Sequence, residues 1–568
     1  MYITVIPNRN SPPAILLRES FREDGVVKNR TLANLSDWAP ERIEAFKVLL
    51  KGGTPVTGAE PEVVASLAHG HVAAVLGMVR ALEVDKLLHG RRHRMRELTL
   101  ALVAGRILEP SSKLALAQGL QAGAEHSTLG SELGLGEVDE NEFYEAMDWL
   151  VERQPRIEAA LAKRHLGEGC MVLYDLSSSY FEGHCCPLAQ YGHSRDKRED
   201  RPQINYGLLC NVEGVPIAID VVEGKVGDPK TIPDQVEKLK ERFGLKRVVV
   251  VGDRGMVTEA RIRQDVQEAG YDWITALRHA SIQPMVNKRV IQPSLFDERG
   301  LAEITHPDYP GERLIACFNP FMKEERARKR EALLQLTEAG LAKVAANCER
   351  PRKPLEGKGE IGLKAGAVLS KFKMGKYFKV RVGDYSLGYF RNQELLDQEA
   401  ALDGIYVIRT SVPKAELSDQ EAVLAYKRLA KVERAFRTMK SVDLQVRPIF
   451  HHLERRVKAH LFICMLAYYV EYHLRQAWQE LLYHDEGGSQ RKTPVAPVSP
   501  SAEGKAKKAT GRSKDGLPLQ TFAGLLKSLA SLSRSQVRLG ADGPTYARTT
   551  KPTSLQARAL ELIGLKEA

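Results

Sequence analysis

The sequence lacks several features that would point to particular classes of protein. Its seven cysteines are odd in number and include no Cys-x-x-Cys pair, which argues against a disulfide framework and a zinc ribbon. It has neither a glycine-rich phosphate loop nor a nucleophile elbow. The first residues do not form a signal peptide, and the longest apolar block, residues 459–470, is too short to cross a bilayer. We therefore expect a protein of the reducing cytoplasm without a membrane partner.

The composition favours a large globular protein with a polyanionic partner. A chain of 568 residues is too long for one typical domain, and 43% apolar residues are enough for two to four real cores. Lys and Arg number 83 against 72 Asp and Glu, so the net charge is +11 and the isoelectric point is about 9.1. Such an excess suggests nucleic acid as the partner, although a modest excess can also serve solubility alone.

Two short apolar runs end in a carboxylate. Asp175 lies near the end of the run 171–176, and four valines at 248–251 are followed by Gly252 and Asp253. Such runs are typical of strands buried on both faces, where a carboxylate is an exception. An Asp at the end of a strand can also be a helix N-cap or a turn former. The joint pattern favours one shared site, to which Glu433 adds a third acid able to hold a divalent metal.

The segment that separates the two aspartates predicts a specific order of elements. Residues 204–210 and 215–222 flank a turn and form a hairpin, which makes three antiparallel strands with the Asp175 strand. A helix from Asp228 as N-cap to Phe243 follows, then the Asp253 strand, a helix at 258–269 and a strand at 273–277. This is the order of a ribonuclease-H-like α/β fold, which carries its acids on the first and fourth strands and on a late helix.

The helical stretch 424–440 carries the third acid. Its apolar residues form one stripe at helical spacing: Leu429, Val432, Phe436 and Met439. An adjacent stripe combines an aromatic residue, an acid and two cations: Tyr426, Glu433, Arg437 and Lys440. This arrangement suits a metal ligand flanked by phosphate contacts. The alternative is an exposed helix on which Glu433 pairs with Arg437 at i, i+4.

The rest of the chain completes a mixed α/β architecture of a core, an inserted β-rich subdomain and a mainly helical N-terminal DNA-binding region. Four arginines at 91–96 lie at a helix start, where they either bind phosphate or form a solvated basic face. We predict seven segments: a small β element at 1–38, a helical DNA-binding region at 39–168, the first core segment at 169–278, an inserted subdomain at 279–400, the second core segment at 401–484, a disordered basic linker at 485–516 and a helical C-terminal segment at 517–568.

Five stretches of the sequence carry a family resemblance: 174–178, 192–197, 251–255, 426–440 and 447–451. Together they resemble a DDE transposase of the bacterial insertion-sequence type, in the group with a β-rich insert between the second Asp and the Glu. In that group's signature an Arg stands three residues after the Tyr. Here Tyr426, Glu433 and Lys440 match, whereas Leu429 occupies the Arg position, and Arg428 or Arg437 would take over its phosphate contact.

The resemblance implies Mg²⁺-dependent cleavage at transposon ends followed by DNA strand transfer. Asp175, Asp253 and Glu433 would hold two Mg²⁺ ions, with Mn²⁺ as a substitute, in a two-metal displacement. Tyr426, Lys440, Arg254, Arg437 and Arg428 would contact DNA. The implied partners are the terminal inverted repeats, target DNA and a second copy of the chain in a homodimer on paired ends.

Three alternatives compete with this hypothesis. A ribonuclease-H-like endonuclease without strand transfer would share the three acids, and the large insert and basic termini favour transposition over it. A non-catalytic DNA-binding protein would not need all three acids. In a metabolic enzyme the basic charge would be incidental, and DNA binding would then show no dependence on salt.

Overall fold

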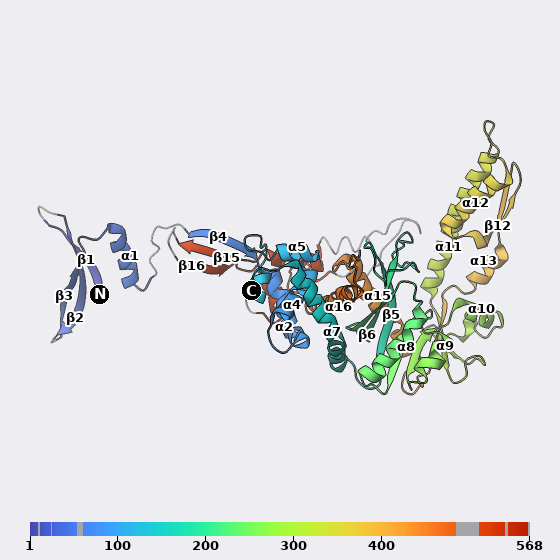
Figure 1. The fold of residues 1–568 in the computed structure, drawn as a ribbon, viewed down its shortest axis with the longest axis horizontal. Coiled ribbons are helices and arrows are strands. Elements are labelled where there is room, and N and C mark those ends of the chain that lie inside the picture. The colour runs from blue at the N-terminus through green and yellow to red at the C-terminus, as the bar shows by residue number, and fades with distance from the viewer. Residues whose placement is uncertain (9–11, 24, 54–60, 484–509, 540–543, 566–568) are drawn as a thin grey trace. The chain divides into compact units, whose positions relative to one another are not determined.

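The computed structural model describes residues 1–8, 12–23, 25–53, 61–483, 510–539 and 544–565 (Figure 1). Two compact units are present: residues 1–67 with 533–551, and residues 68–532 with 552–568. Of the predicted linker at 485–516, residues 485–509 lie outside the described residues. Within the described residues, every helix is too short or too polar to span a bilayer.

The smaller unit contains two three-stranded sheets and one helix. The first sheet is an antiparallel meander of β1 (Tyr2–Ile6), β2 (Ala14–Glu23) and β3 (Val26–Asn34), which confirms the strands predicted at the N-terminus. Helix α1 (Pro40–Leu50) follows, with proline in its first turn, where no backbone N–H is needed. The second sheet has the order β16-β15-β4 and joins distant segments of the chain: β4 (Pro61–Ala68), β15 (Ser533–Leu539) and β16 (Thr545–Thr549).

These last three strands were not predicted. The sequence at 61–68 falls in a region expected to be helical, and the segment from 517 was also expected to be helical throughout. Each strand is short, β4 and β16 are largely exposed, and none of the three sequences has the alternating apolar pattern that identifies a half-buried strand. The pairing of β4 with β15 joins residues more than 450 positions apart, which local patterns do not reveal.

The larger unit is built on an eight-stranded mixed sheet of order β10-β11-β14-β9-β8-β5-β6-β7. Its first five strands in the chain are β5 (Cys170–Tyr180), β6 (Gln203–Asn211), β7 (Pro216–Glu223), β8 (Val248–Gly252) and β9 (Asp272–Ala276). β5, β6 and β7 are antiparallel, whereas β8 runs parallel to both β5 and β9. The spatial order β7-β6-β5-β8-β9 confirms the ribonuclease-H-like mixed α/β fold.

The two crossover segments of this core are less regular than the sequence predicts. The first consists of a 3₁₀ turn (Asp228–Thr231), α8 (Ile232–Glu237) and a π-helical turn (Lys238–Arg242). The second is α9 (Glu259–Arg261), followed by a π-helical turn (Ile262–Val266). The prediction that Asp228 caps the first helix is wrong, because Gly227 occupies the cap position and the Asp228 carboxylate instead accepts two hydrogen bonds from Arg195.

A helical layer covers one side of the sheet around α16 (Glu454–Ala477). This helix contacts β7 of the sheet and three helices of the N-terminal region. It is buried around most of its circumference, as expected for an apolar helix inside a core. The other helices of the layer are α2 (Gly70–Ala81), α3 (Val84–Leu88), α4 (Arg94–Leu108), α5 (Lys113–Gln118), α6 (Leu129–Leu133) and α7 (Glu140–His165).

The four arginines at 91–96 lie before and within the first turn of α4. Arg94 donates to Glu142 at 2.9 Å, and Arg96 donates to Glu97 at 2.7 Å. Arg92 donates to the Leu133 carbonyl at 2.6 Å. Since protein acceptors already satisfy three of the four side chains, the structure favours intramolecular ion pairing over an external phosphate here.

The segment between the two halves of the core contains more helix than strand, so the expected β-rich character is only partly present. It comprises α10 (His279–Asn287), β10 (Leu301–Ile304), β11 (Arg313–Phe318), α11 (Pro320–Cys348), α12 (Lys358–Phe372), β12 (Phe378–Val382), β13 (Leu387–Arg391), α13 (Gln393–Ala400) and β14 (Ile405–Thr410). β10, β11 and β14 extend the main sheet, and α11, α12 and the β12–β13 hairpin form a separate apolar core.

Two C-terminal helices pack on the core of the larger unit. They are α18 (Phe522–Ala530), which contacts α2, and α19 (Ser554–Glu561). The buried Trp478 at the end of α16 donates its indole N–H to the Ala559 carbonyl at 2.8 Å. A buried indole N–H needs such a partner, so this hydrogen bond fixes α19 against the core.

Candidate functional site

Asp175 and Asp253 lie side by side because their strands are neighbours. β5 and β8 are parallel, and the last matched pair in their register is Tyr174 with Gly252. Asp175 and Asp253 are the next residues on each chain. Adjacent strands are about 4.8 Å apart, so the two carboxylates arise at one edge of the sheet. The apolar runs that precede them in the sequence are the buried stretches of these two strands.

A tight turn and a phenol orient the Asp253 carboxylate. Its Oδ2 accepts the Gly255 backbone N–H at 3.1 Å, which closes a turn directly after β8. Its Oδ1 accepts the Tyr426 hydroxyl at 3.2 Å. Burial raises the pKa of the Tyr426 phenol, and the neighbouring Asp253 raises it further, so this hydroxyl remains a donor at neutral pH.

Glu433 comes from a helix that follows the insert. The predicted helix 424–440 is divided into α14 (Asp419–Lys427), α15 (Leu429–Arg437) and a π-helical turn (Thr438–Val442). α15 contacts β5 and buries Val432, Ala435 and Phe436. Phe436 meets Tyr206 of β6 edge to face, with ring centroids 5.7 Å apart. This apolar contact fixes α15 on the sheet, and the adjacent stripe with Glu433 lines the same pocket as the two aspartates.

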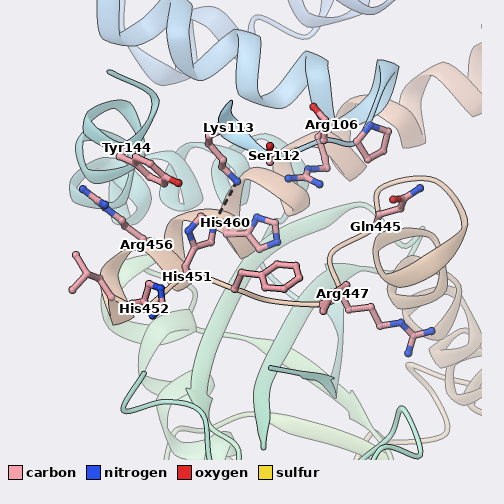
Figure 2. A pocket seen from close by; sticks show the side chains of 15 residues that line it. Arg106, Ser112, Lys113, Tyr144, Gln445, Arg447, His451, His452, Arg456 and His460 are labelled. Carbon is pink, nitrogen blue, oxygen red and sulfur yellow. Dashed lines mark hydrogen bonds between the residues drawn. The ribbon is translucent and has the colours of Figure 1, made fainter. Parts of the chain in front are cut away.

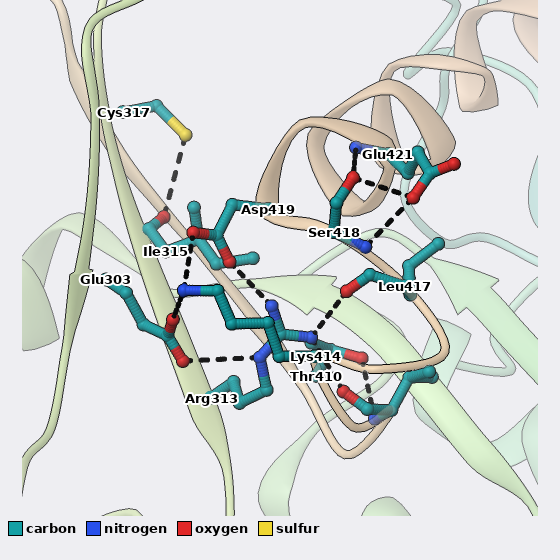
Figure 3. A network of polar contacts seen from close by, with 11 residues as sticks. Glu303, Arg313, Ile315, Cys317, Thr410, Lys414, Leu417, Ser418, Asp419 and Glu421 are labelled. Atoms are coloured by element: carbon teal, nitrogen blue, oxygen red, sulfur yellow. Dashed lines mark hydrogen bonds and ion pairs between the residues drawn. The ribbon is translucent and has the colours of Figure 1, made fainter. Parts of the chain in front are cut away.

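A polar network fixes the start of α14 (Figure 3). Ser418 and Glu421 form a capping box, in which the serine hydroxyl accepts the Glu421 N–H and the glutamate accepts the Ser418 N–H. Asp419 pairs with Arg313 of β11 at 2.6 Å and with Lys414 at 3.4 Å. Glu303 of β10 pairs with the same two cations. The strands of the insert therefore anchor the helices that present Tyr426 and Glu433.

One pocket of about 800 Å³ joins the predicted site residues. Asp175, Asp253 and Glu433 all line it, although they come from β5, the end of β8 and α15. Four of the five predicted DNA contacts line it as well: Tyr426, Arg437, Lys440 and Arg254. Arg428 does not. It lies at the junction of α14 and α15, where its charge adds to that of Lys431 in lowering the pKa of Glu213.

The Asp175 carboxylate is buried and is influenced by the charges of the other two acids. Burial raises the pKa of Asp175 to about 7, against the lowering effects of the Leu176 N–H and Arg195, and the charges of Asp253 and Glu433 add to the rise. No cation in the described residues forms an ion pair with Glu433, so the Glu433–Arg437 pair considered from the sequence is not formed. The described residues contain no three acidic, His or Cys side chains close enough to enclose one metal ion by themselves.

Lys440 and Asp196, which belongs to the stretch 192–197, form a buried ionic cluster together with Arg447. Lys440 donates to Asp196 at 3.1 Å, and Arg447 pairs with the same carboxylate. The Asp196 side chain is 1% exposed and also accepts the Tyr180 backbone N–H at 3.3 Å. The Lys440 ammonium is therefore already neutralised, which differs from the free cation that the signature suggests.

Several residues that line the pocket were missed by sequence reasoning. Arg195 donates two 2.6 Å hydrogen bonds to Asp228, and both side chains line the pocket. Arg326 comes from α11 of the insert, so the insert contributes directly to the site. The stretch 192–197 was a signal for Arg195 and Asp196, because it places charged residues directly after a glycine outside any regular element. Nothing local marked Arg326, which belongs to a long charged helix.

Gly192 itself has a packing role near this stretch. A Cβ on Gly192 would lie 2.0 Å from the Gly224 carbonyl oxygen, which is far inside contact distance. The backbone that carries Arg195 and Asp196 can therefore approach the loop after β7 only without a side chain at this position. Leu429, which stands at the signature's Arg position, also lines the pocket and contributes an apolar wall.

If Asp253 is the metal ligand that the sequence predicts, replacement of Tyr426 by Phe should lower the rate of the predicted metal-dependent DNA cleavage by about 10- to 100-fold, the usual cost of losing a group that orients a metal ligand. The hydroxyl that fixes Asp253 Oδ1 would be lost, while the ring would stay in place. The concentration of divalent metal that gives the half-maximal rate should rise. Tyr472→Phe is the matched control, because it removes a 3.1 Å bond to the Glu213 carbonyl outside the pocket. Equal rates for the two variants would contradict a positioning role for Tyr426.

Comparison with known proteins identifies the family to which the chain belongs. Residues 170–470 match the model of the transposase DDE domain, and residues 3–61 match the N-terminal domain of IS1634 family transposases. No curated protein sequence matches. A piggyBac transposase in a synaptic complex with hairpin DNA aligns over 81% of this chain and 78% of that chain, at 9% identity and a TM-score of 0.33, too low to carry an argument. The DDE match spans more than half of the 568 residues, and the chain therefore belongs to the DDE transposases, metal-dependent enzymes that bind and cleave DNA.

Proposed function

We propose that Asp175, Asp253 and Glu433 are the catalytic acids and hold two Mg²⁺ ions for cleavage at the transposon ends and strand transfer into target DNA. The observation that carries this proposal is that three acids from distant positions in the chain line one pocket. The register of β5 with β8 and the contact of α15 with β5 give the arrangement a structural cause.

The donor set suits divalent magnesium. Mg²⁺ prefers oxygen ligands and is usually bound through one or two carboxylates, with waters and substrate phosphates completing the shell. Three carboxylates spread over a pocket of about 800 Å³ fit this mode better than a closed protein cage. Burial is the main cause of the raised pKa of Asp175, and the charges of Asp253 and Glu433 add to the rise, so a bound cation would favour the ionised carboxylate. Bound ions would supply activation of the water or 3′-hydroxyl nucleophile and stabilisation of the leaving oxygen.

The walls of the pocket supply the contacts to DNA. Arg254, Arg326 and Arg437 line it, and among the described residues none of these guanidinium groups is in an ion pair. Free arginines can bind backbone phosphates through paired N–H donors. Arg254 stands next to Asp253, Arg437 one turn after Glu433, and Arg326 on the insert. These positions surround the acids with cations, so they orient a phosphodiester over the carboxylates.

Transposition joins two ends, which favours action as a homodimer on paired ends in the nucleoid. Each copy would bind one end, and the complex would contain two chains. Light scattering of the protein with end-bearing DNA in Ca²⁺ should give a mass of two chains with two duplexes. A mass of one chain with one duplex at saturating DNA would rule out this assembly.

The test of the proposed function uses purified protein, end-bearing DNA, Mg²⁺ and a target plasmid. We expect cleavage at the ends and covalently joined end–plasmid products, both absent in EDTA. Joined products separate a transposase from an endonuclease that shares the same acids. Nicked ends without joined products would contradict strand transfer while leaving metal-dependent cleavage in place.

A further inference from the structure

A second pocket in the larger unit is lined by positive charge (Figure 2). It has a volume of about 560 Å³ and lies where the end of α4, the start of α5, α7 and the segment before α16 meet. Its cationic lining residues are Arg106, Lys113, Arg447 and Arg456, together with three histidines. No Asp or Glu is found among the described residues that line it.

Two of these cations have no acidic partner. Among the described residues, neither Arg106 nor Lys113 forms an ion pair with a carboxylate. The Lys113 side chain is buried, with 6% of the residue exposed, and its ammonium lies 3.3 Å from the His451 ring nitrogen. Arg447 shares the Asp196 carboxylate with Lys440, and Arg456 lies 3.6 Å from Asp148. Positive charge thus concentrates around Arg106 and Lys113.

The protein carries a free-energy cost at this position. Burial of a charged group without a counter-ion is expensive, and a group can reduce this cost by losing its proton. Burial, with the charge of Arg106 as the next cause, lowers the pKa of Lys113 to about 7. Burial likewise lowers the pKa of His451 to about 3, with Lys113 and Arg106 as the next causes. An anion in the pocket would reverse these shifts.

His460 provides an independent observation. It is 5% exposed and lines the pocket from α16. Its Nε2 lies 3.0 Å from the Val446 carbonyl, which can only accept, so Nε2 carries the proton. The opposite nitrogen, Nδ1, is buried without a hydrogen-bond partner among the described residues. A buried ring nitrogen of this kind normally has a hydrogen-bond partner. Nδ1 of the neutral ring can only accept, so it donates to a phosphate oxygen once the bound anion raises the pKa of His460 and the ring takes a second proton.

We propose that this pocket binds a phosphate group of the DNA backbone, outside the catalytic pocket, through Arg106, Lys113 and Arg456. The proposal rests on the assignment of the chain as a DNA-cleaving transposase, which makes DNA the phosphate source at hand. An ionic chain connects the two pockets: Arg447 lines this one, Lys440 lines the catalytic one, and both pair with Asp196. A DNA strand that enters the catalytic pocket is thereby also held at a second phosphate.

The experiment measures the affinity of end-bearing duplex over a range of salt concentrations in EDTA, so that it does not depend on the catalytic acids. Arg106→Gln and Lys113→Met should each weaken binding by about 5- to 10-fold and reduce the slope of log K against log salt by about 1. Arg156→Gln is the control, because Arg156 is an exposed arginine on α7 outside both pockets. It should change neither quantity.

Stability of the free protein separates a binding role from a structural one. Lys113→Met removes an uncompensated buried charge, so the melting temperature without DNA should rise by about 2–4 °C while DNA affinity falls. A lysine needed for folding would give a lower melting temperature instead. Unchanged DNA affinity and salt slope in both folded variants would overturn the proposal.

A parallel titration with inorganic phosphate identifies the source of the phosphate group. If phosphate stabilises the wild type but not Arg106→Gln, and both bind DNA equally, the pocket takes a free anion and the DNA assignment is wrong. If inorganic phosphate displaces DNA from the wild type but not from Arg106→Gln, the assignment to a DNA phosphate is supported. Loss of cleavage in the catalytic variants leaves either result unchanged.

Discussion

Glu433→Gln is expected to reduce DNA cleavage by at least about 10³-fold while leaving binding to end-bearing DNA nearly unchanged. The substitution keeps the size and shape of the side chain but removes its charge and places an amide N–H₂ where a cation would bind. Loss of a metal ligand costs several kcal/mol of transition-state stabilisation, and each 1.4 kcal/mol is about tenfold in rate. Binding should persist because Glu433 repels DNA phosphates in the absence of metal.

The control for this variant is Glu394→Gln. Glu394 is an exposed glutamate on α13, remote in sequence from the pocket lining, and its substitution removes the same charge. Single-turnover cleavage of labelled end DNA gives the cleavage rate, and a gel-shift titration in EDTA gives the affinity for DNA. Cleavage by Glu433→Gln at more than a tenth of the wild-type rate would show that another residue completes the acidic site.

The second large effect concerns stability rather than rate. Asp196→Ala should destabilise the larger unit by about 3–5 kcal/mol, because it leaves two cations beside a buried site without their carboxylate. Lys440 and Arg447 are 10% and 27% exposed at their side chains, so water compensates them poorly. Urea unfolding measures the loss. Cleavage should also fall, since Lys440 lines the catalytic pocket.

An exposed ion pair provides the comparison for Asp196. Glu325 and Lys329 pair on α11 at 2.6 Å, with side chains 52% and 55% exposed. Glu325→Ala should change stability by no more than about 0.5 kcal/mol, because solvent already screens that pair. The difference between the losses of unfolding free energy in the two variants isolates the effect of burial. A loss below about 1 kcal/mol for Asp196→Ala would mean that water replaces the carboxylate easily.

The core of the fold was predictable because its signals are local. Four valines before Asp253 identify a buried strand, the turn around Gly214 identifies the β6–β7 hairpin, and the order of elements follows from their spacing. The two aspartates could be expected to meet, since each follows the apolar run of one of two parallel strands, although β5 continues past Asp175 to Tyr180. The strand β14, which returns the chain to the sheet, was also recognisable from its apolar residues.

The remaining features depend on contacts between distant residues. Asp228 resembles a helix cap in the sequence, but Arg195 reaches it from a different loop and takes its carboxylate. The sequence places Arg428 on one helix with Glu433, whereas the break between α14 and α15 turns it out of the pocket. Arg326 enters the pocket only because α11 of the insert lies next to the core. None of these outcomes leaves a pattern in the local sequence.

The central claim is that Asp175, Asp253 and Glu433 act together on metal, and crystals of the protein with end-bearing DNA and Mn²⁺ test it most directly. Anomalous scattering from Mn²⁺ should give two peaks in the pocket, each in contact with at least one of the three carboxylates. In Glu433→Gln, at least one of the two peaks should be lost. Strong peaks at other side chains, with this pocket empty, would contradict the account.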